Sequence, residues 1–389
     1  MKNDVSLEVR VPYMDDLRVL SVLPVLGHPR DSKRIAMLQE SKFVVEAVAF
    51  ERDYHSGRLP TCPVESLGRI ENRKYIKRIM KLFSALPVLR RKISENDLVY
   101  ASGPDMAYIA LIAGVGLRKP VVLEVGDIRE IQVADGLIGW VVRMLDRLFL
   151  TRCSLLIATA PGFVQHYYRE WLKSAIPAMV IENKLEASVA CELAIGARVV
   201  GVEGKPLVDR PLRIGYFGAL RSEWSWQVLK QVAESRSDIE IVFAGYPMKP
   251  ADLPSLVSKY KNMRYLGTYQ SPGDLPHLYG SIDIVWACYP PIGPQEGWAR
   301  TNRFYESCLF RRPMICRLGS SDAVEVQKYG IGLIASGDDA SHVAIEVSSI
   351  SLEDVDLWRR NMEAVPKSLF IYTTEPDDLY HKISELLTR

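Results

Sequence analysis

The feature that most constrains this chain is the regular alternation of short apolar runs with longer amphipathic segments. Continuously apolar runs are typical of strands that helices cover on both faces, and helix-length spacers between strands indicate βαβ units in parallel sheets. One group of runs precedes residue 185 and a second follows residue 210. We expect strands at 18–26, 44–50, 98–102, 120–125, 155–159 and 179–182, and at 212–217, 239–244, 264–266, 282–287, 313–317 and 332–335.

The two groups of strands predict an α/β protein with two doubly wound, Rossmann-like domains that face a central cleft. A chain of 389 residues is long for a single hydrophobic core, which also favours two domains. Ligands of such folds bind beyond the carboxyl ends of the strands, so the cleft is the expected ligand site. We place an N-terminal domain at 1–184, a linker at 185–210, a C-terminal domain at 211–365, and a helical segment at 366–389 that could pack back on the N-terminal domain.

Composition narrows the functional classes. Hydrophobic residues make up 48% and charged residues 25% of the chain, as in an ordinary folded protein. The six cysteines form no CxxC pair and no cluster with histidines, which predicts a reducing compartment and no structural zinc. A polar N-terminus and the lack of a long apolar run predict a cytoplasmic protein, or one peripheral at the inner face of the plasma membrane. A net charge of +2 does not suggest nucleic-acid binding.

The most specific functional signal is a helix start in the second half of the chain. A buried strand ends at Tyr289, a loop rich in Pro and Gly follows, and a helix opens at Thr301. Thr301 is a candidate N-cap, and unpaired N–H groups in a first helical turn attract anions. The same helix carries Asn302, Arg303 and Glu306. Arg303 and Glu306 share one face, which offers a cation to a diphosphate and a carboxylate to ribose hydroxyls, although a surface ion pair is the alternative.

A glycine turn earlier in this half gives a weaker signal. The strand at 212–217 runs into Gly218, where the missing side chain lets backbone N–H groups approach a phosphate. Arg221 follows and adds a positive charge. A tight turn between a strand and a helix explains the same glycine equally well.

In their order along the chain, these segments resemble the nucleotide-sugar domain of the GT-B glycosyltransferases. The similarity extends to Arg311-Arg312-Pro313-Met314-Ile315 and covers residues 212–340. It is greatest to family 4 and to related polysaccharide and glucuronosyl transferases, which carry an Asn-Lys-x-x-Glu helix followed by Gly-Lys-Pro-Val-Ile.

The resemblance implies roles for individual residues. Arg303 takes the place of a lysine at the donor phosphates, and Glu306 takes that of the carboxylate that binds ribose. Tyr289 and Asn302 are implied to line the phosphate side of the donor. Tyr269 is implied to lie near the nucleotide base.

The activity implied by the resemblance is the transfer of a sugar from a nucleoside-diphosphate sugar to a saccharide or lipid-linked saccharide in surface polysaccharide or glycan biosynthesis. A UDP-sugar donor is favoured over a GDP-sugar. No pair of aspartates stands in a convincing donor context, which predicts a metal-independent reaction with no further cofactor. Many family members have a second glutamate eight residues before the ribose-binding one, where this chain has Trp298. Two other classes remain open, namely a sugar-nucleotide epimerase of similar fold and a non-catalytic nucleotide- or sugar-binding module.

The N-terminal half supplies a candidate general base. The strand at 120–125 runs into Gly126 and Asp127, at the edge of the sheet where cleft residues are expected. Transfer with inversion needs a base that takes the proton of the acceptor hydroxyl, and a carboxylate suits this role. The stretch resembles the Tyr-Glu-x-His-Asp segment of family 4, with Gly126 in place of the histidine, and an inverting glucuronosyltransferase in which this aspartate is the base. A helix N-cap is the alternative for Asp127.

The loop after the first strand offers contacts to the acceptor. His28, Arg30 and Lys33 follow this strand and could meet a phosphorylated acceptor. A structural role in the turn is the alternative for His28.

The stretch from Arg73 to Lys92 is basic and amphipathic and contains no acidic residue. Such a helix suits the surface of an anionic membrane, whereas a solvated helix face is the alternative. The apolar stretch 137–150, with Trp140, Arg143 and Arg147, can add to the same surface or belong to the core. The cations of the first stretch are Arg73, Lys74, Lys77, Arg78, Lys81, Arg90, Arg91 and Lys92.

Overall fold

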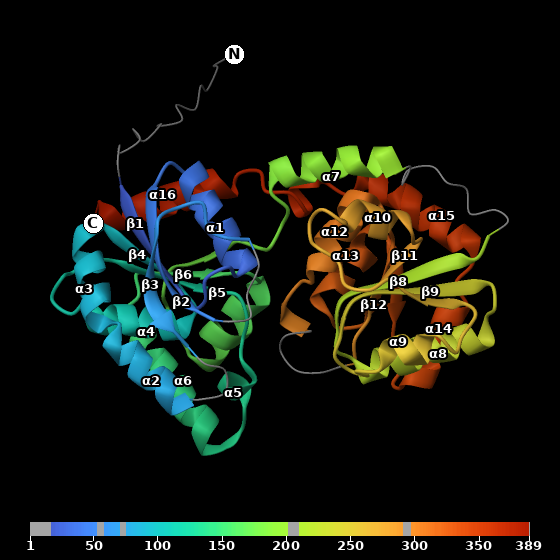
Figure 1. The fold of residues 1–389 in the computed structure, drawn as a ribbon, viewed down its shortest axis with the longest axis horizontal. Coiled ribbons are helices and arrows are strands. Elements are labelled where there is room, and N and C mark those ends of the chain that lie inside the picture. The colour runs from blue at the N-terminus through green and yellow to red at the C-terminus, as the bar shows by residue number, and fades with distance from the viewer. Residues whose placement is uncertain (1–16, 53–57, 71–74, 201–209, 291–296, 389) are drawn as a thin grey trace, which may run out of the picture.

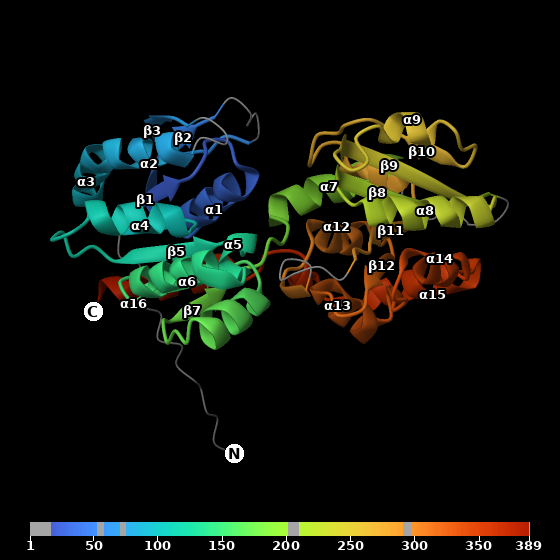
Figure 2. The same ribbon diagram turned by 90° about the horizontal axis from the view of Figure 1, so that it is seen from below.

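The computed structural model describes residues 17–388 apart from 53–57, 71–74, 201–209 and 291–296. Two α/β domains lie beside each other, and each is built on a parallel sheet with helices on both faces (Figures 1 and 2). This arrangement confirms the predicted pair of doubly wound, Rossmann-like domains.

The N-terminal sheet has seven parallel strands in the order β3-β2-β1-β4-β5-β6-β7. The strands are β1 (Arg18–Leu23), β2 (Val44–Glu51), β3 (Val64–Arg69), β4 (Leu98–Ser102), β5 (Val121–Val125), β6 (Leu155–Ala158) and β7 (Ala178–Val180). The helices are α1 (Pro29–Glu40), α2 (Tyr75–Ser84), α3 (Leu86–Glu95), α4 (Pro104–Ala113), α5 (Glu130–Val133), α6 (Gly136–Leu150) and a π-helix η1 (Phe163–Trp171). The strand order reverses between β1 and β4, so the carboxyl ends of these strands flank the crevice in which such sheets bind ligands.

The C-terminal sheet has six parallel strands in the order β10-β9-β8-β11-β12-β13. The strands are β8 (Leu212–Leu220), β9 (Ile239–Pro247), β10 (Met263–Tyr265), β11 (Ile284–Ala287), β12 (Met314–Arg317) and β13 (Gly332–Ala335). The helices are α7 (Ala187–Val200), α8 (Glu223–Ser235), α9 (Leu253–Val257), α10 (Leu275–Gly280), α12 (Asn302–Phe310), α13 (Ser321–Tyr329), α14 (Ala340–Ser348) and α15 (Leu352–Asn361). A last helix, α16 (Glu375–Leu387), follows two short 3-10 turns.

Both sheets are covered by an apolar layer on each face. In β1, Leu20 and Val22 pack in the layer that contains α3 and α4, whereas Val19 and Leu23 pack in the layer that contains α1. This alternation follows from the two-residue period of a strand. It explains why strands buried on both faces consist of continuous apolar runs.

The sequence does not predict strand β3, whose residues form no apolar run. β3 lies at the edge of the N-terminal sheet, and within it only Leu67 is buried. An edge strand pairs with one neighbour and is partly open to solvent, so it needs no continuous apolar run. The sequence therefore predicts the strands of this domain except β3.

The predicted linker at 185–210 contains helix α7. This helix packs on the C-terminal domain, where Leu193 and Ala197 join the apolar layer that also holds residues of α10 and α12. The segment between the sheets is therefore helical over most of its described part.

Helix α16 lies on the N-terminal domain. The rings of Tyr380 and Phe43 have centroids 5.5 Å apart, and the Ser41 hydroxyl donates to the Pro376 carbonyl at 2.7 Å. Leu379 is fully buried in the layer that contains α1. Helix α16 begins at Glu375, and Pro376 lies in its first turn, where proline is tolerated.

The chain crosses between the domains twice at the same place. Leu185 and Ile371 form a parallel bridge between the two crossings. The Leu185 N–H donates to the Phe370 carbonyl at 2.8 Å, and the Tyr372 N–H donates to the Leu185 carbonyl at 3.0 Å. In the part of the chain that the structure describes, no helix is both long and apolar enough to cross a bilayer.

Candidate functional site

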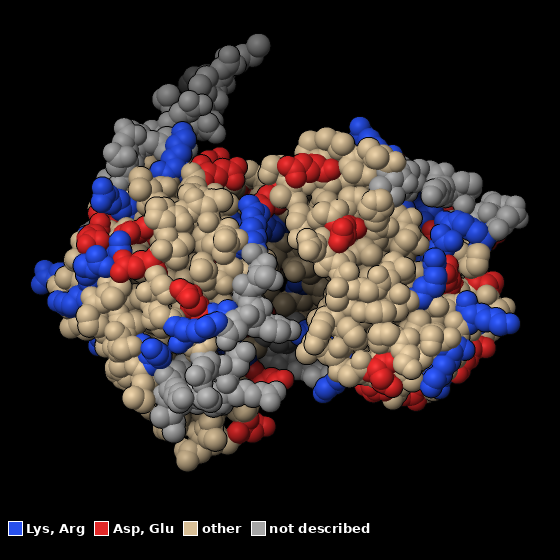
Figure 3. All heavy atoms as spheres, in the orientation of Figure 1, with Lys and Arg blue, Asp and Glu red and all other residues tan. Residues whose placement is uncertain are grey.

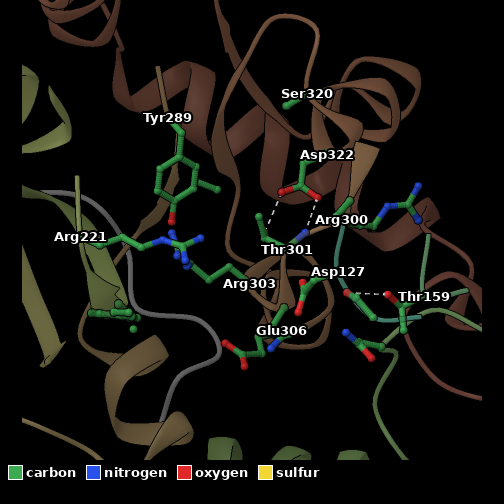
Figure 4. Close-up of a pocket in the computed structure, with 18 of the residues that line it drawn as sticks. Asp127, Thr159, Arg221, Tyr289, Arg300, Thr301, Arg303, Glu306, Ser320 and Asp322 are labelled. Atoms are coloured by element: carbon green, nitrogen blue, oxygen red, sulfur yellow. Dashed lines mark hydrogen bonds between the residues drawn. The ribbon is translucent and has the colours of Figure 1, made fainter. Parts of the chain in front are cut away.

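A cavity of about 790 Å³ lies between the two domains, beyond the carboxyl ends of strands from both sheets. Figure 3 shows the hollow between the domains, and Figure 4 shows side chains that line it. This volume falls in the range of small-ligand sites. The lining includes, from the residues singled out in the sequence, His28, Arg30, Asp127, Gly218, Arg221, Tyr269, Tyr289, Thr301, Asn302, Arg303 and Glu306.

Arg303 stands in the first turn of α12 with its guanidinium held among aromatic rings. The guanidinium carbon lies 5.4 Å from the ring centroid of Tyr216 and 5.2 Å from that of Tyr289. Its Nη1 donates to the Trp286 carbonyl at 3.1 Å. Figure 4 shows Arg221 and Arg303 pointing toward each other near the Tyr289 hydroxyl. Two guanidinium groups that converge on one place form a site suited to an anion.

Gly218 completes this wall of the cavity. Its φ of +110° lies in the region that favours glycine. A Cβ atom there would lie 3.9 Å from Arg303 Nη2 and 4.0 Å from the Tyr269 hydroxyl. The bare backbone of Gly218 is therefore close enough to Arg303 for one bound group to contact both.

Glu306 lies one turn further along α12. The Tyr279 hydroxyl donates to Glu306 Oε2 at 2.7 Å. Burial raises the pKa of Glu306, although the bond from Tyr279 and the charge of Arg303 act in the opposite direction. The carboxylate lines the cavity, where it can accept hydrogen bonds from hydroxyl groups of a ligand.

Thr301 occupies the N-cap position of α12, but its side chain does not cap the helix. Its hydroxyl donates to Asp322 Oδ2 at 2.7 Å, and its N–H donates to Asp322 Oδ1 at 3.1 Å. Burial raises the pKa of Asp322 to about 6, against the effect of these two bonds. Thr301 is therefore the N-cap residue, as expected, but its hydroxyl bonds Asp322 at the start of α13 instead of capping α12.

The sequence does not single out Asp322. A Gly-Ser-Ser-Asp segment at 319–322 follows β12 and opens α13, and Ser320 caps that helix by accepting from the Ala323 N–H. The same succession of a strand, a loop and a helix start drew attention to Arg303, in the preceding pair of elements. The pattern could have nominated the segment, but not its contact with Thr301, which depends on the tertiary fold.

On the opposite wall, Asp127 lies just beyond β5 with a side chain that is 70% exposed. Arg30 Nη1 lies 3.4 Å from Asp127 Oδ2. A Cβ atom on Gly126 would lie 1.5 Å from the same Arg30 nitrogen, so Arg30 fills the space that a side chain at 126 would take. The helix N-cap alternative for Asp127 is wrong, because Arg129 occupies the N-cap of α5.

His28 occupies the N-cap of α1 and lines the cavity. Its Nδ1 lies 3.6 Å from Asp31 Oδ2. Asp31 is buried and accepts a hydrogen bond from the Ser102 hydroxyl at 2.6 Å. The sequence does not single out Asp31, which places a buried carboxylate behind His28.

Lys33 does not reach the cavity lining. Its Nζ donates to the Asn183 carbonyl at 3.2 Å and to the Lys184 carbonyl, and it lies 5.0 Å from the ring centroid of Tyr372. Burial lowers the pKa of Lys33 to about 8. Lys33 therefore holds the two interdomain crossings rather than facing a ligand.

The loop at 297–300 reaches from the C-terminal domain to the N-terminal domain. The ring of Trp298 stacks on that of His166 in η1 with centroids 5.0 Å apart, and its backbone abuts Gly162. Arg300 bridges Glu182 at 3.3 Å and Glu325 at 3.2 Å. Trp298 thus takes part in the contact between the domains.

Comparison with known proteins supports the same architecture. The chain is 28% identical over 291 residues to the succinoglycan biosynthesis protein ExoL of Rhizobium meliloti (strain 1021), which covers 72% of this chain and 71% of ExoL. Sucrose-phosphate synthase from Thermosynechococcus elongatus superposes with a TM-score of 0.73 at 13% identity, over 95% of this chain and 99% of that one. HepE from Anabaena, solved in complex with UDP, superposes with a TM-score of 0.66 at 15% identity, over 96% of this chain and 100% of HepE.

No protein-family model matches the chain, so its similarity to family 4 remains a prediction from the sequence. The structural similarity spans both domains and the cleft between them. The chain has the GT-B fold, the architecture of two facing Rossmann-like domains found in GT-B glycosyltransferases.

Proposed function

We propose that this protein is a glycosyltransferase that moves a sugar from a nucleoside-diphosphate sugar to a saccharide or lipid-linked saccharide in surface polysaccharide biosynthesis. The observation that carries the proposal is the convergence of Arg303, Arg221 and the bare backbone of Gly218 on one wall of the interdomain cavity. The UDP complex of HepE and the part of ExoL in succinoglycan biosynthesis support this reading. We expect the protein to act in the cytoplasm, or as a peripheral protein at the inner face of the plasma membrane.

The donor is best accommodated along α12. Its diphosphate would lie between Arg303 and Gly218, where the first turn of α12 adds a favourable electrostatic potential. Its ribose hydroxyls would donate to Glu306, whose other oxygen accepts from Tyr279. Tyr269, with its hydroxyl near Gly218, would lie on the nucleotide side. A UDP-sugar remains the favoured donor.

The transfer forms a bond between an acceptor oxygen and the anomeric carbon and breaks the bond from that carbon to the diphosphate. Negative charge builds on the leaving diphosphate, and Arg303 stabilises it. We infer a metal-independent reaction because this guanidinium supplies the cation at that place. Asp127 would take the proton of the acceptor hydroxyl if the reaction inverts the anomeric centre.

The acceptor would approach from the N-terminal wall. His28, Arg30 and Asp127 line that side of the cavity. Arg30 pairs with Asp127 at 3.4 Å, and both side chains would face the acceptor. The two walls together give donor and acceptor sides that meet in one cavity.

Thermal unfolding with added nucleotides tests the donor assignment. UDP, GDP and UDP-sugars are added to the wild type, to Arg303→Ala, and to Arg360→Ala as a control on the exposed face of α15. A ligand at about 100 times its Kd stabilises a protein by about 2.7 kcal/mol. We expect this stabilisation for UDP in the wild type and the control, and its loss in Arg303→Ala. If no nucleoside diphosphate stabilises the wild type, the donor assignment fails.

The two alternative classes are separated by product analysis. Incubation with a UDP-sugar and no acceptor would yield an epimerised sugar nucleotide if the protein were an epimerase. Binding without any turnover, with or without saccharide acceptors, would favour a non-catalytic module. A glycosyltransferase releases UDP when an acceptor is supplied.

A further inference from the structure

Helix α6 exposes most of its apolar residues and buries its one acidic residue, Asp146. Leu137, Val141, Met144 and Leu148 recur at the spacing of one helical face, and all of them are exposed. Leu137 is 75% exposed and Leu148 is 54% exposed. Helices of folded domains normally turn such a face toward the core. The further exposed apolar side chains of α6 are Ile138, Trp140 and Leu145.

The buried side of α6 fixes this orientation. Asp146 is buried and accepts hydrogen bonds from Gln132 Nε2 at 2.7 Å and from the hydroxyls of Tyr108 and Tyr167. A Cβ atom on Gly139 would lie 2.0 Å from the Ala134 carbonyl, so the helix approaches the backbone closely there. A satisfied buried polar network of this kind specifies one packing arrangement. The outward apolar face is therefore a consequence of the fold.

The charges within α6 that reach the surface have one sign, whereas the exposed Asp135 precedes the helix. Within α6 the sole acidic residue is the buried Asp146, while Arg147 is exposed and Arg143 is half-buried. The Arg143 guanidinium lies 5.4 Å from the ring centroid of Trp171, and Arg147 donates to the Trp171 and Leu172 carbonyls. Apolar residues flanked by arginines and tryptophans are typical of helices that lie in the interface of an anionic bilayer.

The basic stretch from Arg73 to Lys92 is less suited to this task. Arg73 and Lys74 lie outside the described residues. Lys92 pairs with Glu46 at 2.6 Å, and Arg91 pairs with Glu65 at 2.6 Å. These cations already have acidic partners on β2 and β3, which the sequence of the stretch does not reveal. Helix α2 also exposes Met80 and Phe83, but α4 lies between α2 and α6 (Figure 2).

We propose that α6 is a membrane-docking helix, whose apolar face enters the interface of an anionic bilayer with the exposed Arg147 and Arg152 beside the lipid phosphates. Chain continuity connects this surface to the cavity, since Asp127 lines the cavity and the chain then runs through α5 to the start of α6 at Gly136. Ile131 of α5 is 44% exposed and extends the apolar surface toward that wall. The use of this surface to present a lipid-linked acceptor rests on the proposed function, whereas the docking itself does not.

A bilayer fits this face better than a second copy of the chain. A symmetric dimer through α6 would have to match this apolar face to itself, and Arg147 has no exposed acidic partner within the helix. An anionic lipid surface places negative charge beside the same arginines. A bilayer also covers an apolar face without requiring a complementary protein shape.

Vesicle flotation tests the proposal. The probes are vesicles of phosphatidylcholine alone and of phosphatidylcholine with phosphatidylglycerol, mixed with the full chain. We expect the wild type to float with the anionic vesicles. A variant with Leu137→Glu, Met144→Glu and Leu148→Glu should have a partition coefficient onto these vesicles that is lower by about tenfold or more. A matched control carries Val324→Glu and Ile345→Glu on exposed apolar positions of the C-terminal domain, and it should float like the wild type. Arg152→Glu should lower the preference for the anionic vesicles.

Two further measurements distinguish the loss of membrane docking from misfolding of the variant and from an error in the donor assignment. The triple variant should keep the thermal unfolding midpoint of the wild type, because its changes lie on exposed positions. UDP stabilisation, if present in the wild type, should be unchanged in the variant, since α6 lies outside the cavity lining. A wild type that ignores anionic vesicles overturns the proposal. The proposal is also overturned if light scattering shows that the wild type is a dimer and the triple variant a monomer, and neither protein floats with vesicles.

Discussion

At the scale of single residues, Arg303 and Glu306 lie one helical turn apart, yet different parts of the domain hold them. Arg303 donates to the Trp286 carbonyl at the end of β11, whereas Glu306 accepts from Tyr279 on α10. They are therefore not a surface ion pair. Each side chain is oriented by a contact of its own, so a bound nucleotide would meet a cation and a carboxylate already in place.

Asp127 is the residue whose role is easiest to test by replacement. Asp127→Asn keeps the shape of the side chain and removes its ability to take a proton. We expect the transfer rate to fall about 10²- to 10⁴-fold, the usual contribution of a general base, while UDP affinity stays unchanged. Steady-state kinetics with a saccharide acceptor and calorimetric titration with UDP measure the two quantities.

The matched control is Asp135→Asn, which changes an exposed carboxylate before α6. Its transfer rate should equal that of the wild type. A transfer rate near the wild-type value in Asp127→Asn would remove this residue as the base and direct attention to His28, which has the buried Asp31 behind it.

Local sequence identifies some of these residues and not others. Arg303, Glu306 and Gly218 belong to short segments in which a strand, a turn and a helix start follow one another, so the chain itself shows their spacing. Asp322 and Asp31 gain their positions from contacts with residues far away in the chain, such as Thr301 and Ser102. Such partners depend on the packing of whole elements, which local patterns do not contain.

At the scale of elements, Asp322 joins the starts of α12 and α13. Burial raises its pKa from 3.8 to about 6 in the folded protein. Between these values the folded protein holds the proton and the unfolded chain has lost it, so the free energy of unfolding falls as pH rises from about 4 to 6. The contribution lost is about 3 kcal/mol.

Urea denaturation of the wild type and Asp322→Asn between pH 4 and pH 7 measures this contribution. Other titrating groups are common to both proteins, so the difference between their curves isolates Asp322. We expect the wild type to lose stability relative to the variant as pH rises through this window. Parallel curves would show that this carboxyl titrates alike in both states, and exposed Asp356→Asn provides a variant that should follow the wild type.

The predictability of an element follows from its burial. The strands covered on both faces are continuous apolar runs and are evident in the sequence, as β11 and β12 illustrate. Strand β3 is not predicted, because an edge strand is partly open to solvent and lacks a continuous apolar run. Helix α7 is not predicted, because its small and apolar residues surround the helix and leave a weak 3.6-residue period. The burial of Leu193, which anchors this helix, is a tertiary contact that a local pattern does not contain.

At the scale of the whole molecule, one aromatic stack in the contact between the domains can be removed by a single substitution. The stack of Trp298 on His166 joins a loop of the C-terminal domain to η1 of the N-terminal domain. An aromatic pair contributes about 0.5–1.5 kcal/mol beyond its buried area. Trp298→Ala should therefore shift the balance toward a more open arrangement of the domains by about 2- to 13-fold.

Small-angle scattering of the ligand-free protein measures this shift as a larger radius of gyration. The residues proposed to bind the donor lie within the C-terminal domain, so nucleotide affinity should change little while the transfer rate falls. Trp140→Ala removes a tryptophan on α6, away from the cavity, and should leave the scattering curve as it is. An unchanged radius of gyration in Trp298→Ala would show that the stack does not hold the domains together.

The return of α16 to the N-terminal domain has a consequence for biosynthesis. A ribosome makes β1 and α1 first, but Leu379 and Tyr380, which complete their apolar layer, are made only after the whole C-terminal domain. Domains usually fold in the order in which they emerge. Here the domain begun first must wait, with one face of its sheet partly uncovered, until the other domain has been synthesised. The nascent chain therefore closes its C-terminal domain before its N-terminal domain.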